Sequence, residues 1–476
     1  MRTAREVTLP LRIDQEATAS IPTQLVEGLR ALLTESVLTP GDALPSSRAL
    51  AAHLGIARGS VVTAYEQLVA EGWFDAAAGR STIVNPRLHE VHPRDAQGPG
   101  TTPMRPMPRV TSETSPADQP GVIDLRPGRP HQAGVVGAAW RAAWRRAAEA
   151  PVDVTMPPLG WPDLRLAIAE HLRLMRAVVR DPADIAVTAG GREGLTLLLA
   201  ATGARTVGVE DPGYPSLRRV LREAGATIRP LPADSRGLIT ADLPDDAPDV
   251  VIVTPSHQYP LGGSLPIDRR QQLLAWAQNH DVLIVEDDYD SELRYTSAPL
   301  PALTSLDHHG RVALLGTFAK TLTPALATGF VLLPPRLREA VAATRRTHGQ
   351  PVSLITQRAV ADYLAAGALT RHTQRMRQLY RRRRSLVVEA LGNLPGAHVH
   401  PMDGGLHVVV ELDSGNEGEV ITTLADSGVL VTALSEYWAG AASLRGLVFG
   451  FGAVPDDELT RGLAQIREAL CAQRPR

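Results

Sequence analysis

The chain is nearly devoid of cysteine and has no long hydrophobic run. Its 476 residues include one cysteine, Cys471, so an internal disulfide framework is excluded and a metal site built on cysteine is not expected. No apolar run approaches a membrane span, and the first residues do not resemble a signal peptide. The formal net charge of −2 gives no global attraction to nucleic acid. Together with 44% hydrophobic residues, these absences predict a cytoplasmic protein of two or three domains, with no metal and no membrane partner.

Lysine is almost absent as well. The chain has 49 lysine and arginine residues, of which one, Lys320, is a lysine and 48 are arginines. An arginine guanidinium stays protonated and is a poor nucleophile, whereas a lysine amine can lose its proton and attack a carbonyl. Lys320 follows the apolar run 312–316, so we expect it where a buried strand enters a loop. A lysine retained by chance in an arginine-rich chain would look the same. The residues around Lys320 must therefore distinguish a functional lysine from a chance one.

The first eighty-five residues predict a winged helix-turn-helix. Residues 23–36 place leucines on one helical face, and a Pro-Gly-rich break follows. Ser46 or Ser47 can cap a second short helix that ends at Gly55, and a third amphipathic helix covers about 59–71. Two short β-type segments around a turn then form the wing.

This segment resembles the GntR-type regulators. The stretch PGDALPSSRALAAHLGIARGSVVTAYEQLVAEG matches that family's pattern over almost the whole segment. The third helix begins near Arg58, where free backbone amides attract phosphate. A winged helix used only for protein contacts is the alternative. The resemblance implies double-stranded DNA as partner, contacted by Ser46, Arg48, Arg58, Ser60, Thr63, Gly79 and Arg80.

Residues 86–121 differ in composition from the segments that precede and follow them. The stretch holds eight prolines and no Phe, Trp or Tyr, and it is rich in Ser, Thr, Gly and Asp. Such a segment cannot bury a core, so an extended tether is expected between a DNA-binding head (1–85) and a large body (122–476).

The body alternates apolar runs with amphipathic helices, among them 162–176 and 194–202. This alternation predicts a mostly parallel α/β sheet covered by helices, with functional sites at the carboxyl ends of the strands. The expected strands are IAVT (185–188), TVGVE (206–210), DVVIV (249–253), VLIVE (282–286), VALLG (312–316) and GFVLLP (329–334).

Four polar clusters follow these strands. They are TAGGREGL (188–195), EDPGYP (210–215), VEDDYDSE (285–292) and GTFAK (316–320). The first is a glycine-rich turn that enters a helix, so its amides can hold a phosphate. The other three supply an aromatic face, a carboxylate with a phenol, and an amine. An aldehyde-bearing phosphorylated pyridine needs these groups together.

The body resembles the fold-type I aminotransferases, in the fused form of the MocR/PdxR regulators, from about Gly121 to the C-terminus. TPSHQYPLGG, IVEDDYDSELRY and GTFAKTLTP carry the resemblance. It implies pyridoxal 5′-phosphate (PLP) as cofactor, with Lys320 forming the Schiff base and Asp287 facing the pyridine nitrogen. Tyr289 would lie near the ring 3-hydroxyl, and Tyr214 would stack on the ring. The remaining expected contacts, to phosphate and ring oxygen, come from Gly190, Gly191, Arg192, Thr317 and His257.

Several departures from this family lie at the phosphate. Gly191 and Ala319 stand where the family has serine, Ala327 replaces an arginine, and Thr155 aligns with a tyrosine that reaches the neighbouring subunit. Charge-assisted contacts to phosphate are strong ones, so their loss weakens binding. Ala453 also occupies a position where some members have an arginine for the substrate carboxylate.

We therefore expect a homodimeric DNA-binding regulator that reads paired half-sites and whose body senses PLP, or an aldimine of PLP with a small amine or amino acid, through Lys320. A working aminotransferase with an attached head is one alternative, made less favourable by Ala453. A regulator whose body no longer binds PLP is another.

Overall fold

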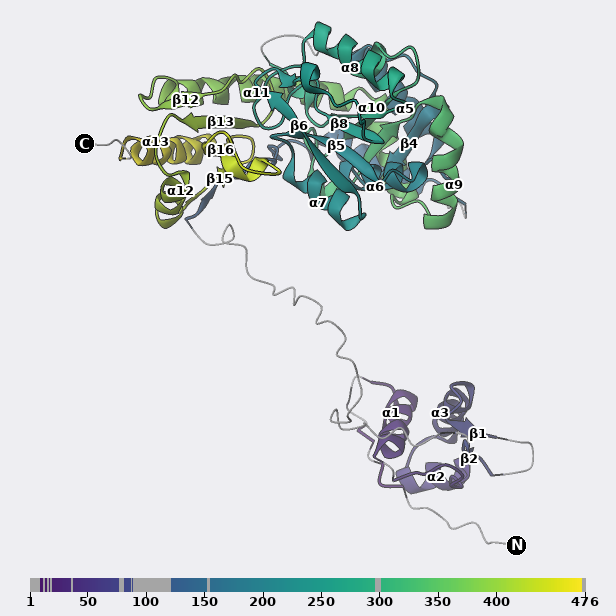
Figure 1. Cartoon of the computed structure of the whole chain (residues 1–476). Helices are drawn as coiled ribbons and strands as arrows, with labels where there is room; N and C mark the ends of the chain where they lie inside the picture. Colours follow the sequence, from purple (N-terminus) through teal and green to yellow (C-terminus); the bar gives the residue numbers. More distant parts are fainter. Residues whose placement is uncertain are drawn as a thin grey trace. The chain divides into compact units, whose positions relative to one another are not determined.

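The chain folds as two units, Met1–Ser112 and Glu113–Arg476 (Figure 1). The computed structural model describes residues 9–11, 13–14, 17, 19–35, 37–76, 81–86, 88, 121–151, 155–295 and 301–472. Most of the expected tether, 86–121, lies outside these residues, as do Gly79 and Arg80 of the expected wing. No helix among the described residues is long and apolar enough to cross a membrane.

The first unit contains three helices and a two-stranded antiparallel wing. Their bounds are α1 Ile21–Thr34, α2 Ser47–Leu54, α3 Arg58–Ala70, β1 Phe74–Asp75 and β2 Ile83–Val84. Ser46 caps α2 by accepting a hydrogen bond from the Ala49 amide at 3.2 Å, and Gly55 ends it in a left-handed conformation. A small core holds these elements together, formed by residues such as Leu25, Leu29, Leu50, Val61, Leu68 and Phe74.

An eight-stranded sheet forms the centre of the second unit, in the order β4-β11-β10-β9-β8-β5-β6-β7. The five strands from β10 to β6 are mutually parallel, whereas β11 runs antiparallel to both of its neighbours. The bounds are β4 Ile185–Thr188, β5 Thr206–Asp211, β6 Thr227–Asp234, β7 Gly237–Leu238, β8 Val250–Val253, β9 Leu283–Asp288, β10 Val312–Thr317 and β11 Gly329–Leu332.

Helices cover both faces of this sheet (Figure 1). Side chains alternate along β8, so Val250 and Ile252 pack with α6, α7 and α9, whereas Val251 and Val253 pack with α8. Helices α5 and α10 cover the β4–β11–β10 part of that second face. Their bounds are α5 Pro162–Arg176, α6 Gly191–Thr202, α7 Pro215–Glu223, α8 Ile267–Asn279, α9 Arg338–His348 and α10 Leu354–Ala365. A further helix, α4, covers Ala138–Glu149 and packs on α10.

A smaller lobe follows in the chain, built on an antiparallel sheet in the order β12-β13-β16-β15. The short strand β3 (Ile123–Asp124) reaches this lobe and pairs in parallel with β14 (Val429–Leu430). The other bounds are β12 Ala397–Val399, β13 His407–Leu412, β15 Thr432–Ala433, β16 Gly446–Gly450, α11 Ala368–Leu391, α12 Glu417–Asp426 and α13 Asp456–Ala472.

The arginine-rich stretch 371–386 lies on α11. Four of its seven arginines are exposed, and the other three are half-buried or buried. Arg383 is 1% exposed and donates to the Phe451 and Gly452 carbonyls at 3.0 and 2.7 Å. Arg377 and Arg384 also donate to main-chain carbonyls. These guanidinium groups join α11 to the surrounding loops, because a planar fork of donors can satisfy several carbonyls at once.

Candidate functional site

The carboxyl ends of β10, β9, β8 and β5 meet at one edge of the large sheet, because these four strands are parallel neighbours. A pocket lies at this edge. Residues from three parts of the body line it: the segment before α4, the loops that follow the large-sheet strands, and the small lobe. They are Gly128, Tyr214, Tyr259, Asp287, Tyr289, Asp290, Lys320, Leu406 and His407.

Lys320 enters the pocket from the turn after β10. It is half-buried, and its Nζ donates a hydrogen bond to the Gly128 carbonyl at 2.6 Å. Gly128 has a φ of +100°, and a Cβ there would lie 3.0 Å from the same Nζ. The positive φ favours glycine at this position, and a Cβ there would press on the amine.

Asp287 is the last but one residue of β9 and is 8% exposed. Its carboxylate accepts no hydrogen bond from the described residues, although it faces the pocket. Burial raises its pKa to about 7, and the charges of Asp288 and Asp290 act in the same direction, while Lys320 opposes them. A buried carboxylate without a donor is costly, so this position favours a ligand that brings an N–H group or a positive charge.

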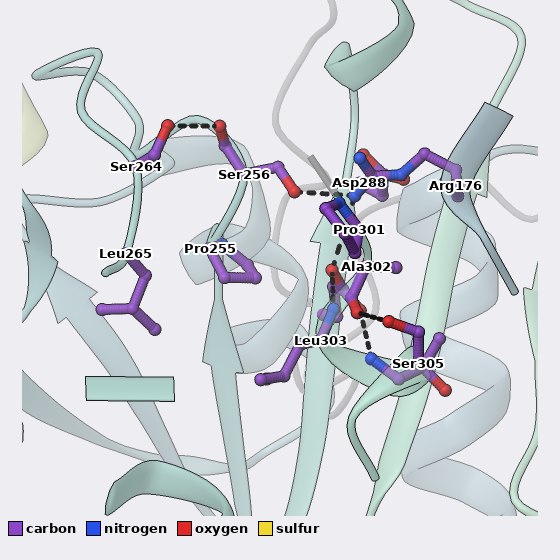
Figure 2. A network of polar contacts seen from close by, with 12 residues as sticks. Arg176, Pro255, Ser256, Ser264, Leu265, Asp288, Pro301, Ala302, Leu303 and Ser305 are labelled. Carbon is purple, nitrogen blue, oxygen red and sulfur yellow. Dashed lines mark hydrogen bonds and ion pairs between the residues drawn. The ribbon is translucent and has the colours of Figure 1, made fainter. Parts of the chain in front are cut away.

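The acidic neighbours of Asp287 in β9 have protein partners, and Figure 2 shows this network around Asp288. Arg176, the last residue of α5, donates to the Asp288 carboxylate at 2.8 Å and to the Ser256 hydroxyl at 2.7 Å. Glu286 accepts from the amides of Leu303 and Thr304 at 2.9 and 3.1 Å. Because successive side chains of a strand point to opposite faces, Asp287 alone of the three is directed into the pocket.

Tyr289 and His257 lie together, with His257 behind the phenol rather than in the pocket lining. The Tyr289 hydroxyl is 2.9 Å from His257 Nδ1 and 3.0 Å from the His257 carbonyl, to which it can donate. His257 Nδ1 also lies 3.0 Å from the Asp290 carboxylate. Burial raises the pKa of the Tyr289 phenol well above its usual value, so this group stays protonated.

Four rings gather on the side formed by Tyr214. Tyr214 caps α7 and meets Tyr259 edge-on, with ring centroids 4.9 Å apart. Tyr259 also contacts Tyr289 at 5.5 Å and His407 at 4.8 Å. His407 Nε2 lies 2.9 Å from the Pro260 carbonyl, and burial lowers the pKa of this imidazole to about 3. His407 is therefore neutral and contributes no charge to the pocket.

The glycine-rich turn forms the N-terminus of α6. Gly190 precedes the helix with φ +95° and ψ −178°, and no side chain caps its first turn. The Glu193 carboxylate accepts from the Ala189 amide at 2.9 Å and pairs with Arg345, so one amide of the turn is already occupied. Thr317 lies close by, 3.9 Å from the position of a Cβ on Gly190. Arg192 is exposed at this helix end.

The residues that replace the family's expected phosphate contacts carry no charge that could make up for the lost binding. Ala319 is half-buried, whereas Ala327 and Thr155 are exposed. Ala327 has a φ of +45°, so the loop takes a left-handed turn where the family pattern has an arginine. Ala453 is exposed and adjoins Gly452, which packs on Leu406 of the pocket.

The first unit places most of the expected DNA-contacting residues on α2 and α3 or at their starts. Arg58 begins α3, and its Nε donates to the Ser47 hydroxyl at 3.3 Å. No side chain caps the N-terminus of α3. Arg48 and Thr63 are exposed, and Ser60 is half-buried. Ser46 caps α2 with its hydroxyl. Gly79 and Arg80 lie outside the described residues.

Pocket residues that the sequence did not single out are Gly128, Tyr259, Asp290, Leu406 and His407. Tyr259 and Asp290 lie within TPSHQYPLGG and IVEDDYDSELRY, two of the motifs that carry the family resemblance. Their place beside the expected residues could have identified them as pocket residues. His407 comes from β13 in the other lobe, and no local pattern identifies it.

Two family models match the chain. Residues 121–465 match "Aminotransferase class I and II", and residues 22–84 match "Bacterial regulatory proteins, gntR family". Among curated relatives, the HTH-type pyridoxine biosynthesis transcriptional regulator PdxR of Corynebacterium glutamicum is 47% identical over 97% of this chain and 98% of its own length. The probable rhizopine catabolism regulatory protein MocR of Rhizobium meliloti is 32% identical over 97% and 96%.

Solved structures similar to the body include aminotransferases. A crystal structure of an archaeal alanine:glyoxylate aminotransferase has a TM-score of 0.69 and 23% identity, covering 74% of this chain and 91% of that protein. The kynurenine aminotransferase of Pyrococcus horikoshii has a TM-score of 0.68 and 23% identity, with coverages of 75% and 92%. The predicted fold, a winged helix followed by a fold-type I aminotransferase-like body, is confirmed.

Proposed function

Because the chain belongs to the GntR-type regulators of the MocR/PdxR kind, whose body is an aminotransferase class I and II domain, we propose that it controls transcription in response to PLP. The ligand assignment rests on one observation, that Lys320 and Asp287 line the same pocket. The chain's one lysine offers an amine, and a buried carboxylate that has no donor among the described residues faces the same space.

The residues present fit PLP. Asp287 would accept a hydrogen bond from the ring nitrogen, and the Tyr289 hydroxyl would stand beside the ring oxygen, with His257 fixing its orientation. Tyr214 would cover one ring face. The amides at the start of α6, with Thr317 and Arg192, would hold the phosphate. PLP supplies an aldehyde that reacts with primary amines, and Lys320 provides that amine.

The protein's own groups prepare this reaction in two ways. The Gly128 carbonyl holds the Lys320 amine in place through a 2.6 Å hydrogen bond. Asp287, with its raised pKa, is ready to exchange a proton near neutral pH. Weak phosphate contacts suit a sensor, because occupancy then follows the supply of PLP rather than remaining saturated.

The regulatory part of the proposal rests on the first unit and on the relatives. A homodimer would present two heads to paired half-sites, and a protein with this task would act at the chromosome, in the cytoplasm. The relative named as a regulator of pyridoxine biosynthesis makes genes of that process the first targets to test. Ligand control further requires that PLP bind two conformations of the body with different affinities.

The test of ligand chemistry is an absorbance titration with PLP, followed by borohydride reduction and peptide mapping. We expect a new band near about 420 nm and a pyridoxyl label on the peptide containing Lys320. The Lys320→Arg variant keeps the charge and loses the reactive amine, so it should show neither. Absence of band and label at saturating PLP would reject PLP as the covalent ligand and leave a body that serves dimerisation or binds another molecule.

Aminotransferase activity is a second candidate, favoured by the joint presence of Lys320, Asp287 and Tyr289 in the pocket. Among the residues that line the pocket, Lys320 is the one lysine or arginine, and Ala453 has no charged side chain. An α-amino acid would therefore find no arginine for its carboxylate there. We expect little turnover of amino donors by the PLP-loaded protein, and sustained turnover would favour the enzyme over the sensor.

A further inference from the structure

Arg218, the fourth residue of α7, is a buried cation surrounded by main-chain carbonyls. It is 4% exposed and forms no ion pair among the described residues of the body. Its Nη1 donates to the carbonyls of Gly213 and Tyr437 at 3.0 and 2.6 Å. Its Nη2 donates to those of Glu436 and Trp438 at 2.9 and 3.2 Å. Burial of an arginine is costly, and here four carbonyl dipoles offset that cost.

Two further hydrogen bonds join the same two segments. The Gly213 amide donates to the Tyr437 carbonyl at 2.9 Å, and the Ala439 amide donates to the Asp211 carboxylate at 2.7 Å. One segment is the loop between β5 and α7, which carries Tyr214. The other, residues 434–439, lies between β15 and β16 of the small lobe. Arg218 and its neighbours therefore tie the large sheet to the small lobe.

This tie lies directly beside the pocket. The Tyr437 ring is 5.5 Å from the Tyr259 ring, which in turn meets Tyr214 at 4.9 Å. The pocket needs both lobes, since the large sheet supplies Lys320 and Asp287 while the small lobe supplies Leu406 and His407. Any movement of 434–439 away from the β5–α7 loop would separate these rings and widen the pocket.

We infer that Arg218 is a positioning residue that locks the small lobe to the β5–α7 loop and holds Tyr214 at the pocket in the absence of ligand. An arginine suits this task because its planar fork reaches carbonyls on both segments at once. Separation of the two segments would leave the buried guanidinium with the Gly213 carbonyl and without its three acceptors on 434–439. The inference depends on the proposed function only in using PLP as a probe.

The experiment compares the full-length protein with the Arg218→Met and Arg218→Lys variants. Amide hydrogen exchange is first measured without ligand, because the amides of Gly213 and Ala439 report the tie directly. We expect exchange at these two amides to accelerate about tenfold or more in both variants, since one ammonium group cannot replace the fork, while amides in the centre of the large sheet keep their rates. PLP should then dissociate at least about tenfold faster, with an unchanged pH dependence of binding.

Arg229→Met is the matched control. Arg229 also donates to a carbonyl, that of Asp246, but it is half-buried, pairs with the Asp246 carboxylate and lies on β6 of the large sheet, outside the small lobe. Its removal should alter neither exchange nor PLP dissociation. Should Arg218→Met prevent folding, Asp211→Ala loosens the same contact while keeping the four carbonyl acceptors of Arg218, and Asp211→Asn, which retains an acceptor for Ala439, should restore the hydrogen bond.

Unchanged exchange at Gly213 and Ala439 in the Arg218 variants would overturn the inference, and so would equal effects of Asp211→Ala and Asp211→Asn. These readings need no ligand. Failure of the unmodified protein to bind PLP would instead contradict the proposed function and would leave the exchange result to decide the role of Arg218.

Discussion

At the scale of single residues, the three consecutive acids of β9 illustrate how one strand separates structural and functional charge. Glu286 and Asp288 point to the interior, where amides and Arg176 neutralise them. Asp287 points the other way and has no donor among the described residues. The sequence Glu-Asp-Asp alone does not reveal this division, which depends on an arginine more than a hundred positions earlier.

The first prediction concerns Asp287 and pH. Burial raises its folded-state pKa to about 7, whereas an unfolded aspartate titrates near about 3.9. Between these values the folded state retains a proton that the unfolded state has released. The free energy of unfolding therefore falls as pH rises from about 4 to about 7, and this loss persists above that range. Asparagine carries no such dependence.

Between about pH 5 and pH 8, the free energy of unfolding of the ligand-free protein should fall as pH rises. We expect this fall to be smaller in Asp287→Asn than in the unmodified protein, by on the order of 2 kcal/mol. The same variant should bind PLP more weakly, because the ring nitrogen loses its charged partner. Thermal melting of both proteins at the two pH values measures the first effect, and a PLP titration measures the second. Identical pH profiles would show that Asp287 does not titrate near neutrality.

At the scale of elements, α6 offers an internal comparison because glycines flank both of its ends in left-handed conformations. Gly190 has φ +95° and ψ −178°, a region open essentially to glycine, and Gly203 has φ +67° and ψ 18°. A Cβ at Gly190 meets no atom closer than 3.9 Å, and one at Gly203 meets none within 4 Å. In both cases substitution acts through the backbone and not through a clash.

Gly190→Ala should therefore disturb the turn at the expected phosphate end of the site and weaken PLP binding about tenfold or more, since 1–3 kcal/mol of strain is typical of such positions. Gly203→Ala should cost about 1–2 kcal/mol of stability and leave PLP affinity within about twofold, because it lies at the other end of the helix. Melting temperatures and PLP titrations of both variants make the comparison. Equal losses of affinity would mean that the turn has no special part in binding.

How much of the body the sequence predicts depends on the element. The expected strands IAVT and VALLG agree with β4 and β10 to within a residue, and 162–176 agrees with α5, because apolar runs and helical periodicity mark them. The direction of β11 was not predictable, since an apolar run carries no sign of antiparallel pairing. The strand β6, TIRPLPAD, was missed because its prolines and exposed residues resemble a loop.

The residues of the candidate site likewise divide into those that the sequence predicts and those that it does not. Lys320, Asp287, Tyr289 and Tyr214 were predictable because they follow strands whose carboxyl ends meet in a parallel sheet. His407 was not, because it depends on the packing of the small lobe against the large sheet. The carbonyl-binding roles of the α11 arginines and of Arg218 could not be predicted either. In sequence, an arginine that binds buried carbonyls looks the same as one that faces water.

At the scale of the whole molecule, DNA binding has to arise from few charges. Residues 1–85 contain 7 arginines against 9 Asp and Glu residues. Arg30 is in addition paired with Glu71 through both carboxylate oxygens. Of the other six arginines, Arg48 and Arg58 are exposed, whereas Arg2, Arg5, Arg12 and Arg80 lie outside the described residues. If Arg48, Arg58 and Arg80, the arginines expected to contact DNA, bind phosphates, each head neutralises about three charges.

The salt dependence of binding tests this arrangement in the full-length protein. For about three phosphates per head, the slope of log affinity against log salt concentration should be about −3 on a random-sequence duplex that accommodates one head. On a duplex long enough for both heads of a homodimer it should be about −6. Fluorescence anisotropy at several salt concentrations gives both slopes. A single slope for both lengths would contradict binding by paired heads.

Arg58→Ala should reduce the magnitude of the slope by about 1 per bound head, because the first residue of α3 loses its phosphate contact. Arg30→Ala is the matched control: it removes the same charge from the same unit, but from a residue already paired with Glu71. Its slope should stay as in the unmodified protein. Equal reductions in the two variants would mean that the head attracts DNA through its overall charge, and such a mechanism is difficult to reconcile with a unit that carries more acids than arginines.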